Sequence, residues 1–190
     1  PPPYAPHRHI LDSADGVCRK RHTRPPIMMK GVQTWEDAVQ AYEMGLAGVV
    51  LSNHGGRQLD FARSGGEVLE EVMRELRKRG SFPTPAFQGM EEGCCRRGRV
   101  ILKALAMGAT AVGIGRPFLY AYSAYGVDGV IHAINLLRDE LEMNMRLIGA
   151  RSIEELVPSM VDLSALHNHT GAVFPKQDQS VLDFMEKSRL

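Results

Sequence analysis

The feature that most constrains how this chain can fold is a regular alternation of short apolar runs with longer amphipathic segments. Four runs of strand length occur along the chain, and a segment with helical periodicity follows each of them. The run "AGVVL" is continuously apolar rather than alternating, which is typical of a parallel strand covered on both faces. Because repeated strand–helix units place their strands in parallel, the sequence predicts an α/β fold.

The same periodicity gives bounds to the expected elements. Strands are expected at residues 27–31, 47–52, 84–87 and 110–115, with 84–87 the weakest and 110–115 another buried strand. Helices are expected at 34–45, 67–80, 96–108 and 127–149, with a short helical piece near 152–156. Thr34 precedes Asp37 by three residues, as in a capping box, and glycines are placed to end the helices. The second helix gathers its apolar side chains on one face, namely Val68, Leu69, Val72, Met73 and Leu76.

A single domain is the simplest organisation for 190 residues. Residues 1–24 hold prolines and charge with little periodicity and are expected to be a poorly packed lead-in; residues 25–166 form the predicted domain, and 167–190 a polar C-terminal tail. Four strand–helix units are half of the eight that close a TIM (β/α)8 barrel, which typically needs about 250 residues. The units alone therefore leave two alternatives, an open doubly wound sheet and a piece of a barrel.

Composition excludes several classes of function. A formal net charge of +1 gives no electrostatic footprint for nucleic acid or for an acidic membrane surface. The apolar runs are far shorter than the roughly 18 residues that indicate a membrane-spanning helix. Three cysteines, two of them adjacent, make a poor disulfide framework and favour a reducing compartment. A zinc site is disfavoured because its candidate ligands lack paired spacing: Cys18, His22, Cys94 and Cys95.

Polar and glycine-rich segments follow all four expected strands. They begin with Lys30, then "SNHGGRQ" at 52–58, "QGMEEGCCRRG" at 88–98 and "GIGRPF" at 113–118. Reactive groups gather at the carboxyl ends of parallel strands in α/β folds. Each of these ends carries a cation or a titratable group beside glycine, so the sequence predicts a site at one edge of the sheet.

Two of these side chains suit chemistry on a small acid. His54 can take up a proton near neutral pH, as a general base must. Arg57 offers a planar fork that matches a carboxylate, and Gly55 and Gly56 allow the backbone to approach a ligand closely. The structural alternatives are a turn histidine bonded to the backbone and an arginine in a surface salt bridge.

The remaining strand ends suit an anion. Lys30 is either a point charge facing a developing anion or an ordinary surface lysine with a buried stem. The segments "RRG" and "GIGRP" combine glycine amides, a helix start and arginine, a combination that favours phosphate. On the last two strands of a barrel, these segments occupy the place where such folds often hold phosphate.

The segment "SNHGGRQ" resembles the active-site signature of the FMN-dependent 2-hydroxy acid dehydrogenase and oxidase family, which includes glycolate oxidase, lactate oxidase and flavocytochrome b2. The segments "KGVQTWEDA", "LKALAMGA", "GIGRPFLY" and "LRDELEM" are also similar to this family, nearest to its fungal flavocytochrome b2-like members. The resemblance runs from about residue 26 to about residue 166. It implies a TIM barrel of which this chain supplies the C-terminal half, as four βα units.

The resemblance also implies roles for individual residues. His54 would be the base that takes a proton from the substrate, and Arg57, with His54, would bind the substrate. Lys30 would face the N1/O2 edge of FMN and stabilise the reduced anion, and Ser52 would contact the flavin. The phosphate of FMN would be held by Arg96, Gly115 and Arg116.

The chain departs from the family pattern in the segment before "RRG". The family has "DGG" there; in this sequence Glu92 stands for the aspartate, Gly93 for the first glycine and Cys94 for the second, if "RRG" is the anchor. If Phe87 is the anchor instead, about three residues have been inserted. Glu92 and Gly93 are therefore further expected cofactor contacts, in a loop that has gained bulk. Val100 stands where the family usually has aspartate.

The expected function is FMN-dependent oxidation of an L-2-hydroxy acid of the lactate or glycolate class to the 2-oxo acid. The first half of the barrel, with its substrate-contacting tyrosines, is not expected in this chain, nor is a haem domain. The main alternative is therefore a truncated, non-catalytic half-barrel that retains binding of phosphate, FMN or a partner. A different phosphate-binding barrel enzyme is a third reading, against which "SNHGGRQ" argues.

Partners and location follow from the same reading. The expected partner is the small 2-hydroxy acid, with no nucleic acid, membrane or metal, and self-association into a homo-oligomer is left open. Ser188, Arg189 and Leu190 resemble a peroxisomal address of the S-K-L type. The expected location is therefore the peroxisome, with the cytoplasm and the mitochondrion as alternatives.

Overall fold

The computed structural model describes residues 25–80, 88–93, 96–164 and 166. Its four strands form one parallel sheet with the order β1-β2-β3-β4, so that each strand pairs with its successor in the chain. The strands are β1 (Met28–Val32), β2 (Gly48–Leu51), β3 (Gln88–Gly93) and β4 (Ala111–Ile114). The prediction of a parallel α/β fold is confirmed, and the sequential strand order is that of a piece of barrel wall rather than a doubly wound sheet.

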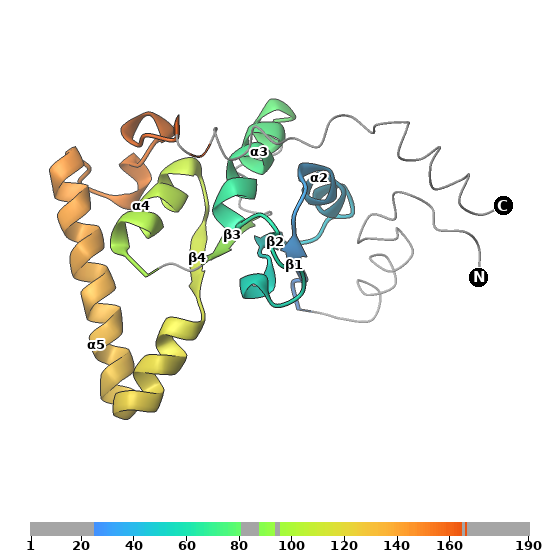
Figure 1. Ribbon diagram of the computed structural model, residues 1–190. Helices are drawn as coiled ribbons and strands as arrows, with labels where there is room; N and C mark the ends of the chain where they lie inside the picture. Colours follow the sequence, from blue (N-terminus) through green and yellow to red (C-terminus); the bar gives the residue numbers. More distant parts are fainter. Residues whose placement is uncertain (1–24, 81–87, 94–95, 165, 167–190) are drawn as a thin grey trace.

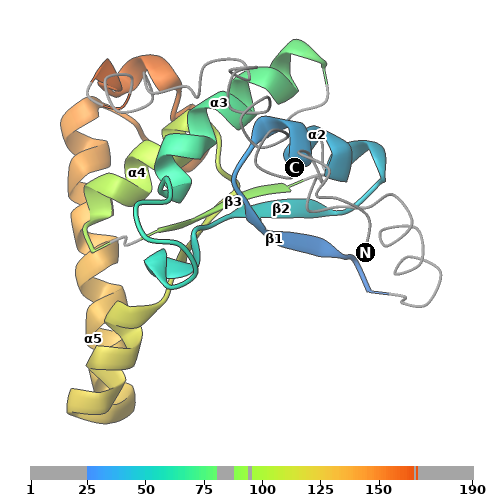
Figure 2. The same ribbon diagram turned by 45° about the vertical axis from the view of Figure 1, so that its right-hand side comes forward.

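Helices follow the strands in the expected alternation. They are α2 (Trp35–Glu43), α3 (Gly65–Lys78), α4 (Gly98–Met107) and α5 (Arg116–Ile148), with short 3-10 turns η1 (His54–Gly56), η2 (Ile153–Glu155) and η3 (Pro158–Met160). Figures 1 and 2 show α2 and α3 over the same face of the sheet, while α5 stands beside α4 at the far side. The outer helices thus cover one face of the curved sheet, as they do in a barrel.

Helix α2 begins at its predicted signal, and α2 and α3 both end at the predicted glycines. Thr34 Oγ1 accepts a hydrogen bond from the backbone N–H of Asp37, at 3.3 Å, and caps α2. Ser64 and Glu67 form a complete capping box that starts α3 two residues before the expected position. Gly45 and Gly80 follow the helix ends with positive φ, a conformation that glycine adopts without strain.

The core lies between the sheet and these helices. All five apolar residues predicted on one face of α3 are at most 1% exposed, and they pack with Val49 and Leu51 of β2. A second, smaller cluster joins α4 to the chain after α5 through Leu102, Ala106, Ala150 and Leu156. The sheet's helix-covered face therefore holds the main hydrophobic stabilisation of the domain.

The third strand lies later than its sequence suggested. Residues 84–87 fall outside the described part of the chain, whereas β3 covers residues 88–93, which were expected to lie in a loop. Every residue from Gln88 to Glu91 is in register with β2, and Met90 to Gly93 with β4. Pairing on both sides therefore imposes strand structure on a polar sequence of low strand propensity. Glu92 and Gly93 accordingly end a strand, and this corrects their expected place in a loop.

Lys30 does not end its strand. It is the third of five residues in β1, and the strand continues to Val32 through an irregularity between Lys30 and Val32. Gly31, with φ of 97°, carries this irregularity. The Lys30 side chain is exposed, whereas Val32 is buried.

Helix α5 begins eleven residues before the expected start at 127 and consists of two arms. Gly126, with φ of 61° and ψ of −146°, interrupts the helix, and Figure 1 shows the two arms meeting in a sharp bend there. Gly129, the one buried residue of this helix, lies so close to Ala121 O and Tyr125 Cβ that a Cβ at its position would collide with both. The bend therefore brings two glycines and a close backbone approach together.

Strand β4 is more exposed than expected. All four of its residues are partly exposed, although a buried strand was predicted. The physical reason is its place at an edge of the sheet, where it pairs with β3 on one side. The predicted lead-in (1–24) and tail (167–190) lie outside the described residues, as do the four candidate zinc ligands.

Candidate active site

The turn after β2 is the centre of the candidate site. Three consecutive residues, His54, Gly55 and Gly56, have positive φ values of 57°, 67° and 73°. Such a conformation is unfavourable for a histidine, so the surrounding contacts must hold it. The turn places His54 and Arg57 at the carboxyl end of β2, where the sequence predicted them.

Two short polar side chains hold this turn. The backbone N–H of His54 donates to Ser52 Oγ at 3.0 Å, and Ser52 is buried at 3% exposure. Asn53 Oδ1 accepts from the N–H of Gly56 at 3.2 Å, while Asn53 Nδ2 donates to Ala62 O at 3.3 Å. Ser52 and Asn53 therefore fix the backbone that carries the histidine. The family resemblance implied a flavin contact for Ser52, and Asn53 was not predicted, although an asparagine two residues before a Gly–Gly pair is a typical turn signal.

The side chains of His54 and Arg57 are both exposed at this turn. Among the described residues, neither side chain has a hydrogen-bond or ion-pair partner. The salt bridge considered as the alternative for Arg57 therefore has no acid in the described part of the chain. An exposed imidazole and an exposed guanidinium on one rigid turn can accept a proton and bind a carboxylate.

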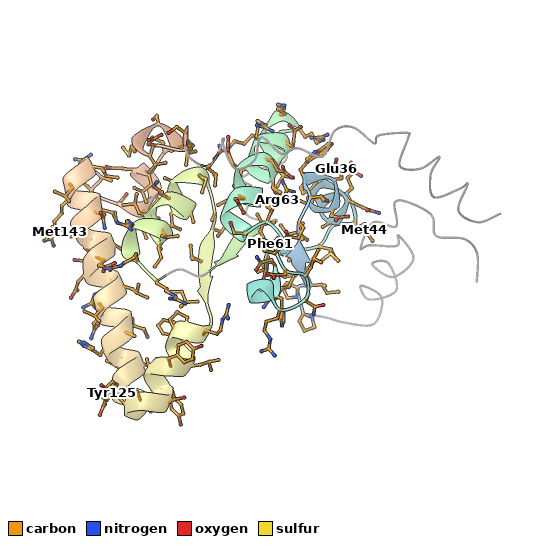
Figure 3. All side chains as sticks on the ribbon, in the orientation of Figure 1. Glu36, Met44, Phe61, Arg63, Tyr125 and Met143 are labelled. Carbon is orange, nitrogen blue, oxygen red and sulfur yellow. The ribbon has the colours of Figure 1, made fainter. Side chains whose placement is uncertain are left out.

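Arg63 anchors the other end of the segment that connects β2 to α3. Arg63 makes a bidentate ion pair with Glu71 of α3, at 2.8 and 3.2 Å, and donates to Gln33 O at 2.6 Å. Figure 3 shows Arg63 and Phe61 in the segment between η1 and α3, with Phe61 almost fully exposed. The segment from β2 to α3 is thus fixed at both ends. Arg63 was not predicted, because its partners lie eight and thirty residues away.

Arg116 reaches this turn from the end of β4. Its Nη2 donates to Gly55 O at 2.9 Å across 61 residues of sequence. β3 lies between β2 and β4 in the sheet, so this contact spans a whole strand. The structure therefore brings Arg116 together with the His54–Arg57 turn, as the common sheet edge predicted.

The start of α5 offers donors to an anion. Gly115 is its N-cap residue, no side chain caps it, and its first turn contains no acidic residue. A Cβ at Gly115 would meet no described atom within 4 Å, so the backbone there is open to a ligand. A guanidinium has five N–H donors, of which Gly55 O takes one of those on Arg116. The arrangement fits a phosphate group such as that of FMN.

The start of α4, in contrast, already holds an anion. Glu140 of α5 accepts from the Gly98 N–H at 2.7 Å and from Arg97 Nη1 at 3.2 Å. The bond from the Gly98 backbone, followed by the bond from Arg97, lowers the pKa of the Glu140 carboxyl below its usual range. The segment "RRG" was predicted as an anion site, and its Gly98 and Arg97 bind a carboxylate of the same chain. Arg96, the residue expected to contact phosphate, is exposed next to them.

The remaining predicted residues line the same edge of the sheet. Lys30 of β1 is in register with Val50, one residue before the end of β2. Glu92 and Gly93 are in register with Gly113 and Ile114, directly before Gly115. The topology therefore gathers the predicted residues at or near the carboxyl ends of four neighbouring strands. In the described part of the chain, no cluster of three or more His, Cys, Asp or Glu side chains could hold a metal ion, and no helix is long and apolar enough to cross a membrane.

Comparison with known proteins decides the family. Residues 14–163 match the family model of FMN-dependent dehydrogenases, a match that begins inside the segment predicted as a lead-in. The chain belongs to this family. An L-lactate dehydrogenase (cytochrome) of Wickerhamomyces anomalus is 55% identical over 149 residues, which are 78% of this chain and 26% of that protein. A peroxisomal (S)-2-hydroxyacid oxidase of Arabidopsis thaliana is 44% identical over 139 residues, 73% of this chain and 36% of the oxidase.

Solved structures give the same family and a common fold. A flavocytochrome b2 mutant with pyruvate bound matches with a TM-score of 0.79 and 52% identity, over 85% of this chain and 40% of that one. A mandelate oxidase mutant with (S)-mandelic acid matches with a TM-score of 0.70 and 36% identity, over 78% of this chain and 42% of that one. These neighbours are TIM barrels, and the four-stranded sheet described here corresponds to part of such a barrel. The chain spans roughly a quarter to two fifths of the relatives it matches.

Proposed function

We propose that this chain supplies the C-terminal half of an FMN-dependent enzyme that oxidises a small L-2-hydroxy acid, of the lactate or glycolate class, to the 2-oxo acid. The observation that carries the proposal is the turn after β2, where Ser52 and Asn53 hold an exposed His54 and Arg57. Arg116, from the start of α5, contacts the same turn. A base, a carboxylate fork and an anion-binding helix start thus share one edge of the sheet.

The chemistry divides among the chain's own residues. Arg57 would hold the substrate carboxylate through paired N–H donors, which orients the hydroxyl-bearing carbon toward His54. A ring nitrogen of His54 would accept a proton from the substrate and become imidazolium. Oxidation to the 2-oxo acid removes two protons and two electrons in all, and FMN, when bound, would accept the two electrons and the proton that His54 does not take.

The cofactor would be held by residues at or near the carboxyl ends of all four strands. We assign the phosphate to Arg116, Gly115 and Arg96, with Gly93 and Glu92 bordering it at the end of β3. Lys30 on β1 would place its ammonium beside the flavin ring, where it would favour negative charge on the ring. Ser52 is already engaged with the His54 N–H, so a flavin contact would use its remaining capacity to donate.

A second candidate function is binding without turnover. It is favoured by the open edges of β1 and β4 in the described sheet. A half-barrel of this kind would retain a phosphate or FMN site, or a partner site, with no complete pocket for a substrate.

The test supplies the complementary part of the barrel. We would co-express the full chain with the flavin-domain segment that precedes the matched region in a relative, the L-lactate dehydrogenase of Saccharomyces cerevisiae, and purify the assembly. Flavin absorbance would measure bound FMN. Anaerobic mixing with L-lactate or glycolate would then measure bleaching of that absorbance.

The outcomes separate the two candidates. A yellow assembly that bleaches with a 2-hydroxy acid supports the enzyme. A yellow assembly that stays oxidised supports binding without turnover. An assembly that stays colourless with excess FMN contradicts both the enzyme and FMN binding, and the chain's Arg116→Ala variant serves as the control for binding through the phosphate.

A further inference from the structure

The contact between Gly55 and Arg116 joins two parts of the proposed site that perform different tasks. Gly55 belongs to the turn that carries His54, and Arg116 belongs to the helix start assigned to the phosphate. The Nη2 of Arg116 donates to Gly55 O at 2.9 Å. The proposed phosphate site at the start of α5 and the turn that carries His54 are therefore joined directly by one hydrogen bond.

The geometry of the turn depends on its contacts from both sides. On the β2 side, Ser52 and Asn53 hold the N–H groups of His54 and Gly56. On the β4 side, Arg116 holds the carbonyl of the residue between them. Because the peptide planes of three consecutive positive-φ residues are linked, a shift of this carbonyl would also turn the His54 backbone.

Gly55 and Gly56 differ in how much room each leaves for a side chain. A Cβ on Gly55 would lie 2.8 Å from Arg116 Nη2 and 3.4 Å from Arg116 Cζ. A Cβ on Gly56 would meet no described atom within 4 Å, although its φ of 73° is close to the 67° of Gly55. Alanine at either position therefore carries similar backbone strain, and only alanine at 55 displaces the arginine.

We propose that Gly55 and Arg116 couple FMN binding to the order of the catalytic turn, so that Arg116 positions His54 as well as binding the phosphate. This inference rests on the proposed function. One N–H of Arg116 stays on Gly55 O while others bind the phosphate oxygens, so a bound phosphate fixes the arginine and the arginine fixes the turn. Such a coupling is reciprocal. If bound phosphate stabilises the ordered turn by a given factor, the ordered turn must raise the affinity for phosphate by the same factor.

The first experiment needs no flavin. Hydrogen–deuterium exchange of the full chain would be measured for peptides covering residues 52–62, in the parent and in Arg116→Ala. Loss of the Gly55 contact should speed exchange at the Gly56 N–H, which the turn protects. Arg97→Ala, which removes an exposed arginine bonded to Glu140 at the neighbouring helix, is the matched control and should leave this turn unchanged.

The second experiment uses the complemented assembly with FMN and with riboflavin, which lacks the phosphate. FMN should slow exchange of residues 52–62 more than riboflavin does in the parent, whereas in Arg116→Ala the two flavins should slow it equally. Gly55→Ala should weaken FMN binding by about fivefold or more relative to Gly56→Ala, the typical range of a coupling between sites. Riboflavin affinity should be equal in the two alanine variants.

The results distinguish the coupling from the proposed function. If the assembly binds FMN but exchange in the turn is the same with and without Arg116, the coupling is wrong. Equal FMN affinity in Gly55→Ala and Gly56→Ala would also overturn it. If the parent assembly binds no FMN, the proposed function fails and the coupling fails with it, even where Arg116→Ala speeds exchange in the chain alone.

Discussion

His54 is a histidine held at φ of 57°, a region where a non-glycine residue pays of order 1–3 kcal/mol. That cost is offset by the bonds that Ser52 and Asn53 make to the turn and by Arg116 at Gly55. Strain of this kind persists where surrounding contacts over-determine the backbone. The turn therefore holds the imidazole in one place, which a general base requires and an ordinary surface turn does not.

His54→Gln tests the base. Glutamine keeps hydrogen-bonding capacity but cannot accept the proton, and general-base catalysis typically contributes about 10²–10⁴-fold. Flavin reduction by L-lactate in the complemented assembly should slow by at least about a hundredfold, while FMN content stays at the parent level. Stopped-flow absorbance of the flavin measures both. Reduction at the parent rate would make the histidine a structural turn residue.

Arg57→Lys tests the carboxylate fork separately. Lysine keeps the charge and loses the paired donors, so substrate binding should weaken while the limiting rate of flavin reduction falls less. The measurement is the dependence of the reduction rate on substrate concentration. A variant with unchanged half-saturation would place the substrate carboxylate elsewhere on the turn.

At the scale of elements, the alternation of strands and helices could be predicted because helix periodicity and capping are local. Thr34, Gly45 and Gly80 act where the sequence indicated. The position of β3 could not be predicted, since "QGMEEG" becomes a strand through its pairing with β2 and β4. The edge strand β4 was predicted as buried for a related reason: an apolar run does not reveal which strands lie beside it.

In the candidate site, too, some features could be predicted from the sequence and others depend on partners far away in the chain. Parallel strands share an edge, so the gathering of Lys30, His54 and Arg116 there could be predicted from the strand–helix repeat. The partners of individual side chains could not, because they lie far apart in sequence: Gly55 with Arg116, and Gly98 with Glu140. The second of these pairs changes the assignment of "RRG", which was predicted as an anion site. Its Gly98 bonds Glu140 and so joins two helices, which leaves Arg96 as its expected phosphate contact.

The close packing of α4 on α5 yields a stability prediction. A Cβ on Gly98 would lie 2.5 Å from the Leu141 backbone N and 2.6 Å from Glu140 Cβ. Gly98→Ala should therefore destabilise the domain by about 1–3 kcal/mol, the usual cost of overpacking. Gly66→Ala in α3 meets no described atom and should be neutral or slightly stabilising. Urea unfolding of both variants measures the difference, and equal midpoints would contradict the tight contact.

The bonds that Glu140 accepts from Gly98 and Arg97 should make the stability of the domain depend on pH. The Gly98 N–H and Arg97 lower its pKa in the folded state, so its contribution to stability is present above the ordinary glutamate pKa of about 4.3 and is lost as the pH falls through the lower folded value. Glu140→Gln should therefore lower the melting temperature near pH 7, and its difference from the parent should shrink in acid. Glu142→Gln, which removes an ion pair with Arg146 on the same helix, is the control. A difference between Glu140→Gln and the parent that grew in acid would contradict the assigned cause.

For the whole molecule, the sheet ends at β1 and β4, and both present an unpaired edge in the described structure. The distal parts of α5 add exposed apolar side chains, including Tyr125 at the bend shown in Figure 3, at 79% exposure, and Leu147 at 77%. Unpaired parallel edges are templates for another strand, and long apolar faces are rarely left in solvent. In the barrels of the matched structures, which are more than twice as long, such edges are closed by further strands.

The last prediction concerns what closes these edges. The purified chain should self-associate in a concentration-dependent way, because the edges of β1 and β4 that are unpaired in the described sheet can pair with other copies. Co-expressed with the preceding barrel segment of the Saccharomyces cerevisiae relative, it should instead form a one-to-one assembly, since eight strands leave no edge. Size-exclusion chromatography with light scattering distinguishes the two states. The first-half segment with proline substitutions in its two outermost strands is the control, because proline cannot donate to a sheet ladder. If the chain alone is a stable monomer that ignores the intact segment, the four-stranded sheet is closed in another way and the half-barrel reading is wrong.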